Sequence, residues 1–190
     1  RIASYTNAQG KVWTWSYDGR TTSIRTPNNI EQKITRNNRK DIVCKSEKDL
    51  LSGKTKVLLI SYGKSHNILE IKSGIGNDIK TATENARLKS SYEYTPSGKL
   101  KASYLWNYSA AAKNDAHCIK TEYEYNASGD IVKEKRSFAD ENKKTTGKVY
   151  CQEFEYSFEG GNKIVTTKKD GILFAREFYN ENGKLVKKTD

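Results

Sequence analysis

The carboxylate pairs of this chain are the residues whose type and spacing most suit catalysis. Glutamates stand two apart at two places: Glu122 with Glu124, and Glu153 with Glu155. Two carboxyl groups flanking one bond are the requirement for glycoside hydrolysis. Both pairs alternate with aromatic residues, however, as on a strand whose two faces differ. We therefore expect them on a solvent face, paired with lysines of partner strands such as Lys133 and Lys135.

The two histidines do not point to an active site. His66 and His117 are far apart, and each lies beside turn residues. No local signature of a serine or cysteine nucleophile accompanies them. P-loop, GxGxxG, HExxH and EF-hand patterns are also missing from the sequence. The sequence therefore predicts no enzyme, no cofactor and no metal site.

The three cysteines, Cys44, Cys118 and Cys151, are widely spaced, and no CxxC occurs. This spacing argues against a structural zinc site or a thioredoxin-type motif. Neighbouring repeats would allow Cys118 and Cys151 to form a disulfide if their Cα atoms came within about 7 Å. The alternative is three small, buried, apolar residues.

Alternating aromatic residues are the best candidates for ligand binding. The set consists of Trp13, Trp15, Tyr17, Tyr104, Trp106 and Tyr108. On strands they would form a platform for stacking sugars or other flat ligands. The alternative is that they are the core face of a sheet, because only 35% of the residues are hydrophobic and few others remain to form a core.

The chain is strongly basic, with a net charge of +11 and a pI near 9.4. Such a charge fits either lysines on solvent faces and strand edges or a cationic surface for nucleic acid, anionic polysaccharide or lipid head groups. The lysines are dispersed and interleaved with glutamates, which favours the solvated face. Nucleic acid is therefore not the expected partner. No apolar run is long enough for a membrane-spanning helix.

A repeated phrase identifies the elements that position these residues. Three copies read Tyr, three turn-forming residues, Gly, one polar residue, then Leu or Ile: Tyr94–Leu100, Tyr125–Ile131 and Tyr179–Leu185. Tyr62–Ile68 and Tyr156–Ile164 are imperfect copies, and the first four tyrosines follow at intervals of 31 or 32 residues. A turn closed by Gly in the left-handed region joins two strands through a bulge. The sequence predicts an all-β, repetitive antiparallel meander of about 10–14 strands, forming an open curved sheet or a partial barrel.

No linker or compositional break divides the chain, so residues 1–190 are expected to form a single domain. The segment 26–53 is less regular, with short strands expected around Ile30–Ile34 and Ile42–Lys45. Short helices are expected, if anywhere, at Glu47–Leu51 and Ala110–Ala116. Neither run is long enough to carry the fold.

The repeat, with the alternating aromatics before it, resembles the YD repeats of Rhs-type and teneurin-type shells, most closely at Tyr123–Val132. It is also similar to bacterial secreted or lipoprotein domains of unknown function that have a porin-like curved sheet. The resemblance covers residues 54–190 and, more loosely, Ser4–Ile24. It implies an envelope or extracellular location and no known catalytic residues. The Asp of YD repeats is absent from the later copies and is present at Asp18, after Tyr17.

These observations lead to the expectation of a non-enzymatic binding or scaffold module, whose ligand is a glycan, a lipid or an envelope protein. The alternatives are a basic nucleic-acid-binding protein, a hydrolase of envelope polymers, or an antitoxin or immunity-type partner. The sequence contains no Met, so we expect it to begin after a removed segment, either a leader or a trimmed part. The expected location is periplasmic, outer-membrane-anchored or extracellular.

Overall fold

The computed structural model describes residues 3–108 and 116–190, and only the backbone at 107, 108, 116 and 117. The described parts contain 15 strands and a short helix. They group into two compact units, Arg1–Ser91 and Tyr92–Asp190, which we describe separately. The expectation of a single domain remains a prediction.

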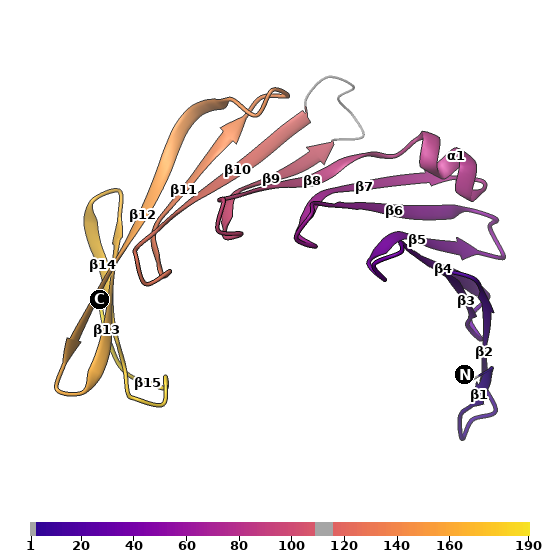
Figure 1. The fold of residues 1–190 in the computed structure, drawn as a ribbon, viewed down its shortest axis with the longest axis horizontal. Helices are drawn as coiled ribbons and strands as arrows, with labels where there is room; N and C mark the ends of the chain where they lie inside the picture. Colours follow the sequence, from indigo (N-terminus) through magenta and orange to yellow (C-terminus); the bar gives the residue numbers. More distant parts are fainter. Residues whose placement is uncertain (1–2, 109–115) are drawn as a thin grey trace. The chain divides into compact units, whose positions relative to one another are not determined.

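Unit 1 contains β1 to β7, helix α1 and most of β8 (Figure 1). The bounds are β1 (Ser4–Thr6), β2 (Val12–Asp18), β3 (Thr21–Arg25), β4 (Ile30–Arg36), β5 (Ile42–Asp49), β6 (Thr55–Tyr62), β7 (Ile68–Gly76), α1 (Ile79–Glu84) and β8 (Arg87–Tyr94). Each strand pairs antiparallel with the next. The segment 26–53 is therefore as regular as the rest, and its two predicted strands are confirmed as the longer β4 and β5.

Unit 2 contains β9 to β15. The bounds are β9 (Leu100–Tyr108), β10 (Ala116–Tyr125), β11 (Ile131–Ala139), β12 (Thr145–Glu159), β13 (Asn162–Lys169), β14 (Ile172–Tyr179) and β15 (Leu185–Thr189). Consecutive strands again pair antiparallel. No described pairing joins the first strand of either unit to its last, so the predicted open, all-β meander is confirmed.

One type of five-residue turn recurs through both units. The first residue donates its backbone N–H to the carbonyl of the fifth, and the fourth has a positive φ. Within the described chain the turn occurs at 7–11, 26–30, 37–41, 63–67, 95–99, 126–130, 140–144 and 180–184. Register shifts immediately precede three of the turns, at Tyr62, Tyr125 and Tyr179, as expected for the predicted bulged hairpin.

Half of these turns do not have Gly at the position with positive φ. Asn29, Lys40, His66 and Lys143 occupy the left-handed position with φ between 60° and 68°. A different feature specifies many of the turns, namely a polar first residue whose side chain accepts backbone N–H groups. The Asn37 side chain, for example, accepts from the backbone N–H groups of Arg39 and Asp41 at 2.9 and 3.0 Å.

In unit 2, two of the repeated tyrosines connect their copy of the motif to the copy before it, whereas the Tyr179 hydroxyl donates to Glu177 of its own strand. The Tyr125 hydroxyl donates to the Leu100 carbonyl at 2.7 Å, and the Tyr156 hydroxyl donates to the Ile131 carbonyl at 2.7 Å. Both acceptors lie 25 residues earlier, at the last position of the preceding copy. A constant period of 31 residues keeps each hydroxyl beside its acceptor. We call these two hydrogen bonds the tyrosine ties.

We expect Tyr125→Phe and Tyr156→Phe each to lower the free energy of unfolding by about 1 kcal/mol, because each leaves a backbone carbonyl without its partner. Urea denaturation followed by circular dichroism measures the loss. Tyr150→Phe is the matched control, since that side chain is 54% exposed in the same unit. Equal stability of the control and the two tie variants would show that the ties do not stabilise the sheet.

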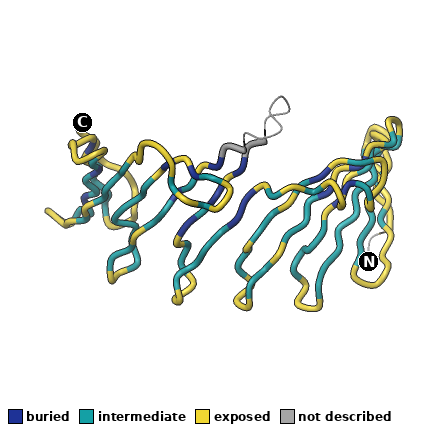
Figure 2. The backbone as a smooth tube through the Cα atoms, turned by 90° about the horizontal axis from the view of Figure 1, so that it is seen from above, coloured by how far each residue is buried: buried dark blue, intermediate teal, exposed yellow. Residues whose placement is uncertain are grey.

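The buried core is thin in both units, and buried stretches are short (Figure 2). In unit 1, α1 lies against β7, where Gly74 and Gly76 leave room for the helix backbone. Ala82 of the helix and Val57 of β6 are fully buried. In unit 2 the core centres on buried residues paired across β9, β10 and β11: Trp106, Cys118 and Ala139.

The helix predictions did not hold where the structure tests them. The prediction at Glu47–Leu51 is wrong, because β5 continues to Asp49 and Glu47 pairs with Gln32 of β4. Most of Ala110–Ala116 lies outside the described residues. Helix α1, which the sequence analysis missed, begins after Asp78, whose side chain accepts from the Thr81 N–H at 2.7 Å. No helix in the described parts is long and apolar enough to cross a bilayer.

Candidate functional site

Three of the four glutamates belong to a row of ion pairs across β10 to β13, which we call the Lys/Glu ladder; the fourth, Glu122, pairs with Lys120 of its own strand at 2.9 Å. The ion pairs of the ladder are Lys135–Glu124 at 2.7 Å, Lys133–Glu153 at 2.6 Å and Lys168–Glu155 at 2.5 Å. The predicted pairing of Lys133 and Lys135 with these glutamates is therefore confirmed. The hydrogen bond from Lys133 lowers the pKa of Glu153, whereas a glycosidase general acid needs a raised pKa. The ladder has the properties of a solvated strand face.

His66 connects two neighbouring turns of unit 1. Its Nδ1 lies 2.7 Å from the Asp41 carboxylate, and this hydrogen bond is the main cause of the lowered pKa of Asp41. Arg39 in the first turn also donates to the carbonyls of Gly63 and Lys64 in the second. The arrangement is a structural link between turns. The His117 side chain lies outside the described residues.

The cysteines are free thiols. Cys118 is fully buried, and burial raises the pKa of its thiol to about 11, so it stays protonated and unreactive at neutral pH. Cys44 and Cys151 are half-buried. The part of the chain with described side chains contains no cluster of three His, Cys, Asp or Glu side chains that would hold a metal ion.

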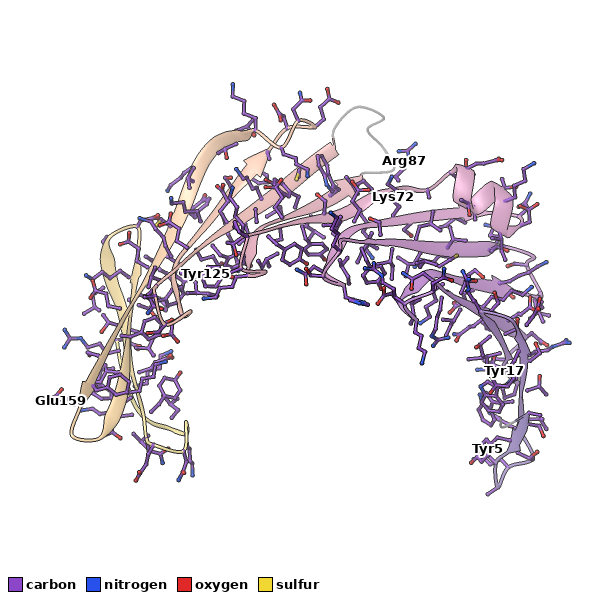
Figure 3. The ribbon with its side chains drawn as sticks, in the orientation of Figure 1. Tyr5, Tyr17, Lys72, Arg87, Tyr125 and Glu159 are labelled. Atoms are coloured by element: carbon purple, nitrogen blue, oxygen red, sulfur yellow. The ribbon has the colours of Figure 1, made fainter. Side chains whose placement is uncertain are left out.

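The six aromatic residues of the predicted platform fall into two groups. On β2 of unit 1, Trp13 and Trp15 are half-buried and Tyr17 is 39% exposed; Figure 3 labels Tyr17. On β9 of unit 2, Tyr104 and Trp106 are buried, and burial raises the pKa of Tyr104 to about 12. The Tyr108 side chain lies outside the described residues. The two described residues on β9 are core residues, and those on β2 remain accessible.

One aromatic residue of β2, Trp13, borders a hollow of about 400 Å³ in unit 1. Trp13 lines it, and the Tyr5 ring supports Trp13 from β1 with centroids 5.6 Å apart and planes at 44°. The other lining residues are mainly polar: Asn7, Gln9, Lys11, Thr26, Pro27, Asn28, Ile30, Gln32 and Glu47. We call this the Trp13 hollow. It combines a large aromatic surface with amide and carboxylate groups.

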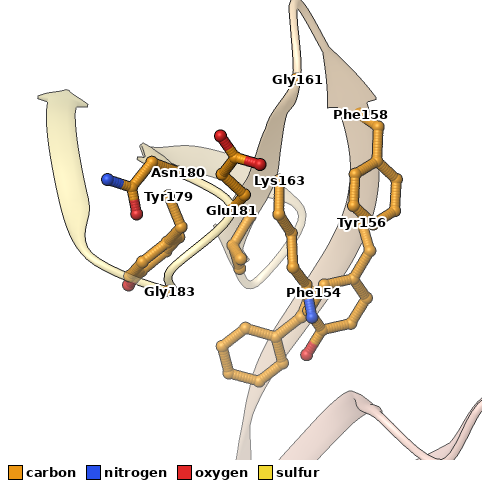
Figure 4. A pocket seen from close by; sticks show the side chains of 10 residues that line it. Phe154, Tyr156, Phe158, Gly161, Lys163, Tyr179, Asn180, Glu181 and Gly183 are labelled. Carbon is orange, nitrogen blue, oxygen red and sulfur yellow. The ribbon is translucent and has the colours of Figure 1, made fainter.

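A second hollow, of about 550 Å³, lies on β12 to β14 of unit 2 (Figure 4). Phe154, Tyr156 and Phe158 line one side, and Phe158 is 77% exposed. The Lys163 ammonium lies 4.6 Å from the centre of the Tyr156 ring. We call this the Phe158 hollow. Their alternation places these three aromatic residues on one face, but the sequence does not indicate that the turn at 180–184 would border a hollow beside them.

Comparison with known proteins identifies the type of repeat. A family model described as RHS Repeat matches residues 1–30. A search of curated proteins found no match. The match to the repeat model and the hairpin architecture together show that the chain carries Rhs/YD-like repeats.

One solved structure shows a similar fold. The crystal structure of TcdB2-TccC3-Cdc42 superposes with a TM-score of 0.59 at 14% identity, covering 97% of this chain and 10% of that chain. The Photorhabdus luminescens Tc holotoxin pore is also similar, with a TM-score of 0.24, 7% identity and coverage of 97% and 15%. The present chain thus spans about a tenth of the length of the first structure that it matches.

Proposed function

We propose that this chain, whose repeats are of the Rhs/YD type, is a non-enzymatic scaffold that binds a ligand in the cell envelope or outside the cell. The observation that carries the proposal is the pair of tyrosine ties in unit 2. They employ the motif tyrosines, which recur most regularly along the chain, to connect successive hairpins. The repeated chemistry therefore serves to build a surface.

The polar residues with catalytic potential support a scaffold role. The Lys/Glu ladder holds its glutamates in ion pairs, and His66 links two turns. Burial keeps the Cys118 thiol protonated. Each of these groups is already engaged in holding the sheet together. The extracellular location is supported by the similarity to Rhs repeats, which is a similarity of fold and repeat type.

The two hollows are the proposed ligand-binding surfaces. Of the predicted aromatic platform, only the accessible residues remain candidates for ligand binding. Trp13, Trp15 and Tyr17 of unit 1 and the Phe158 hollow of unit 2 present aromatic surface. The ligand classes are a glycan, a lipid or an envelope protein. A nucleic-acid-binding role is less well supported, because the ladder lysines are neutralised by glutamates.

A binding panel tests the proposal with the wild-type chain against neutral and anionic polysaccharides, lipid vesicles and single-stranded DNA. We expect saturable binding of a polysaccharide or vesicle that falls at least tenfold in Trp13→Ala or Phe158→Ser. Leu51→Ser is the control, because Leu51 is 81% exposed and lines neither hollow. DNA binding that falls steeply with salt would instead favour nucleic acid. Turnover of a polymer that is lost in Glu122→Gln or Glu124→Gln would overturn the non-enzymatic proposal.

A further inference from the structure

We propose that the Trp13 hollow is a subsite for a neutral saccharide. This inference rests on the binding role proposed above and names the chemical class of its ligand. Two features of the hollow support it: its aromatic wall and its polar rim.

The aromatic wall is Trp13, and Tyr5 of the neighbouring strand holds its ring in place. Trp13 pairs with Tyr5 across β1 and β2, and the tilted contact between their rings restricts the indole. Trp13 is half-buried, so part of the indole packs on the sheet and part lines the hollow. A pyranose ring has a face of C–H groups that packs on such an aromatic surface, and Trp offers the largest one. Because the indole is fixed before binding, little side-chain entropy is lost on contact.

The polar rim matches the hydroxyl groups of a sugar. Each sugar hydroxyl both donates and accepts hydrogen bonds, and amide side chains also do both. Four amides line the hollow: Asn7, Gln9, Asn28 and Gln32. The Gln32 amide donates to Glu47 at 3.1 Å, which orients its carbonyl oxygen and leaves the carboxylate a second oxygen to accept from a ligand. The Asn7 carbonyl oxygen is occupied by two backbone N–H groups, so its NH₂ group is the part left to donate.

The charge and size of the hollow specify the ligand further. Its lining includes one cation, Lys11, and one anion, Glu47, so its net charge is zero, which suits a neutral ligand. A volume of about 400 Å³ falls within the usual range for small-molecule sites, roughly 300–1,000 Å³. The Phe158 hollow differs, because its side chains are mainly aromatic or aliphatic and only a few polar groups border it.

The test is isothermal titration of the full chain with three probes: a neutral hexose hexamer, a neutral N-acetylhexosamine hexamer and an adenine nucleoside. We expect at least one neutral hexamer to bind, and Trp13→Ala to weaken it at least tenfold. Gln32→Met keeps the size of the side chain, and we expect it to weaken the same hexamer at least fivefold. Leu51→Ser is the control in the same unit, since Leu51 is 81% exposed and does not line the hollow, and binding should stay within twofold. Circular dichroism confirms that each variant is folded.

The outcomes separate this inference from the proposed function. If neither hexamer binds, or if Trp13→Ala and Gln32→Met bind as tightly as the wild type, the saccharide subsite is overturned. Binding of the nucleoside alone, lost in Trp13→Ala, would also overturn it. A ligand that binds through the Phe158 hollow would leave the scaffold proposal standing in each case. Only a chain that binds nothing in either hollow would overturn both.

Discussion

Replacing Gly74 by valine is expected to lower the free energy of unfolding of unit 1 by about 3 kcal/mol or more, since overpacking against backbone cannot be relieved by a side-chain rotation. A Cβ at Gly74 would lie 2.0 Å from the carbonyl oxygen of Ala82 and 2.8 Å from the backbone of Ala86. The helix would have to leave β7, which would expose Val57 and Ala82, both fully buried. Urea denaturation, followed by circular dichroism, measures the loss.

Gly63→Ala is the matched control for Gly74→Val. A Cβ at Gly63 would meet the Leu69 side chain at 3.6 Å and the Asn67 carbonyl oxygen at 3.8 Å, both ordinary contact distances, and the φ of Gly63 is not in the left-handed region. We expect a change within about 0.5 kcal/mol, as for most surface substitutions. If Gly74→Val were as stable as Gly63→Ala, the close packing of α1 on β7 would be wrong.

Trp106→Ala is expected to lower the free energy of unfolding by about 3–5 kcal/mol, the usual range for truncating a large buried aromatic residue. Trp106 is 8% exposed and lies opposite Cys118, which is fully buried. Tyr104, two residues earlier on the same face, is only 4% exposed. Chemical denaturation gives the loss, and iodide should quench Trp106 poorly in the folded protein.

Trp15→Ala controls for the loss of an indole from a strand of this sheet. Trp15 is half-buried, so truncating it removes less buried area and should cost less than Trp106→Ala. The order of the two losses distinguishes a core residue from an accessible one. If Trp106→Ala were stable but had lost ligand binding, Trp106 would be a ligand-binding residue and not a core residue.

The repeated motif predicted the strands because its turn chemistry is local. Tyr, a polar turn, Gly and a branched aliphatic residue determine the hairpin within seven residues, and the bulge at Tyr125 follows from that pattern. The turns ending at Asp41 and Lys144 have the same hydrogen bonds, with Lys40 and Lys143 at the left-handed position. A search for Gly overlooks such turns, because a hydrogen-bonding first residue can stabilise them at the cost of backbone strain.

The burial of the aromatic residues could not be predicted, because it depends on contacts between distant strands. Trp13 and Trp106 both sit in alternating aromatic stretches, yet only Trp106 lies among buried neighbours from β10 and β11. The formation of helix α1 also depends on contacts with residues outside the helix. Its six residues have little intrinsic stability, and the room left by Gly74 and Gly76 lets it pack on the sheet.

The ion pairs of the Lys/Glu ladder illustrate the limit of strand pairing as a predictor. The sequence identified the lysines, but not their partners. Lys133 stands directly opposite both Glu124 and Glu153, and its ammonium pairs with Glu153. Glu124 instead pairs diagonally with Lys135. Long side chains choose among neighbours at similar distances, and register alone does not determine that choice.

The tyrosine ties favour one length, 31 residues, for any segment inserted into or deleted from unit 2. Each hydroxyl reaches back 25 residues to the end of the preceding copy. Duplication or excision of 31 residues, from one motif tyrosine to the next, would preserve each donor beside an acceptor, whereas other lengths would separate them. In an array whose neighbours interact pairwise, such an edit adds or removes one link of nearly constant stability. This sheet could therefore lengthen or shorten during evolution in whole repeats, with the interface between successive copies unchanged.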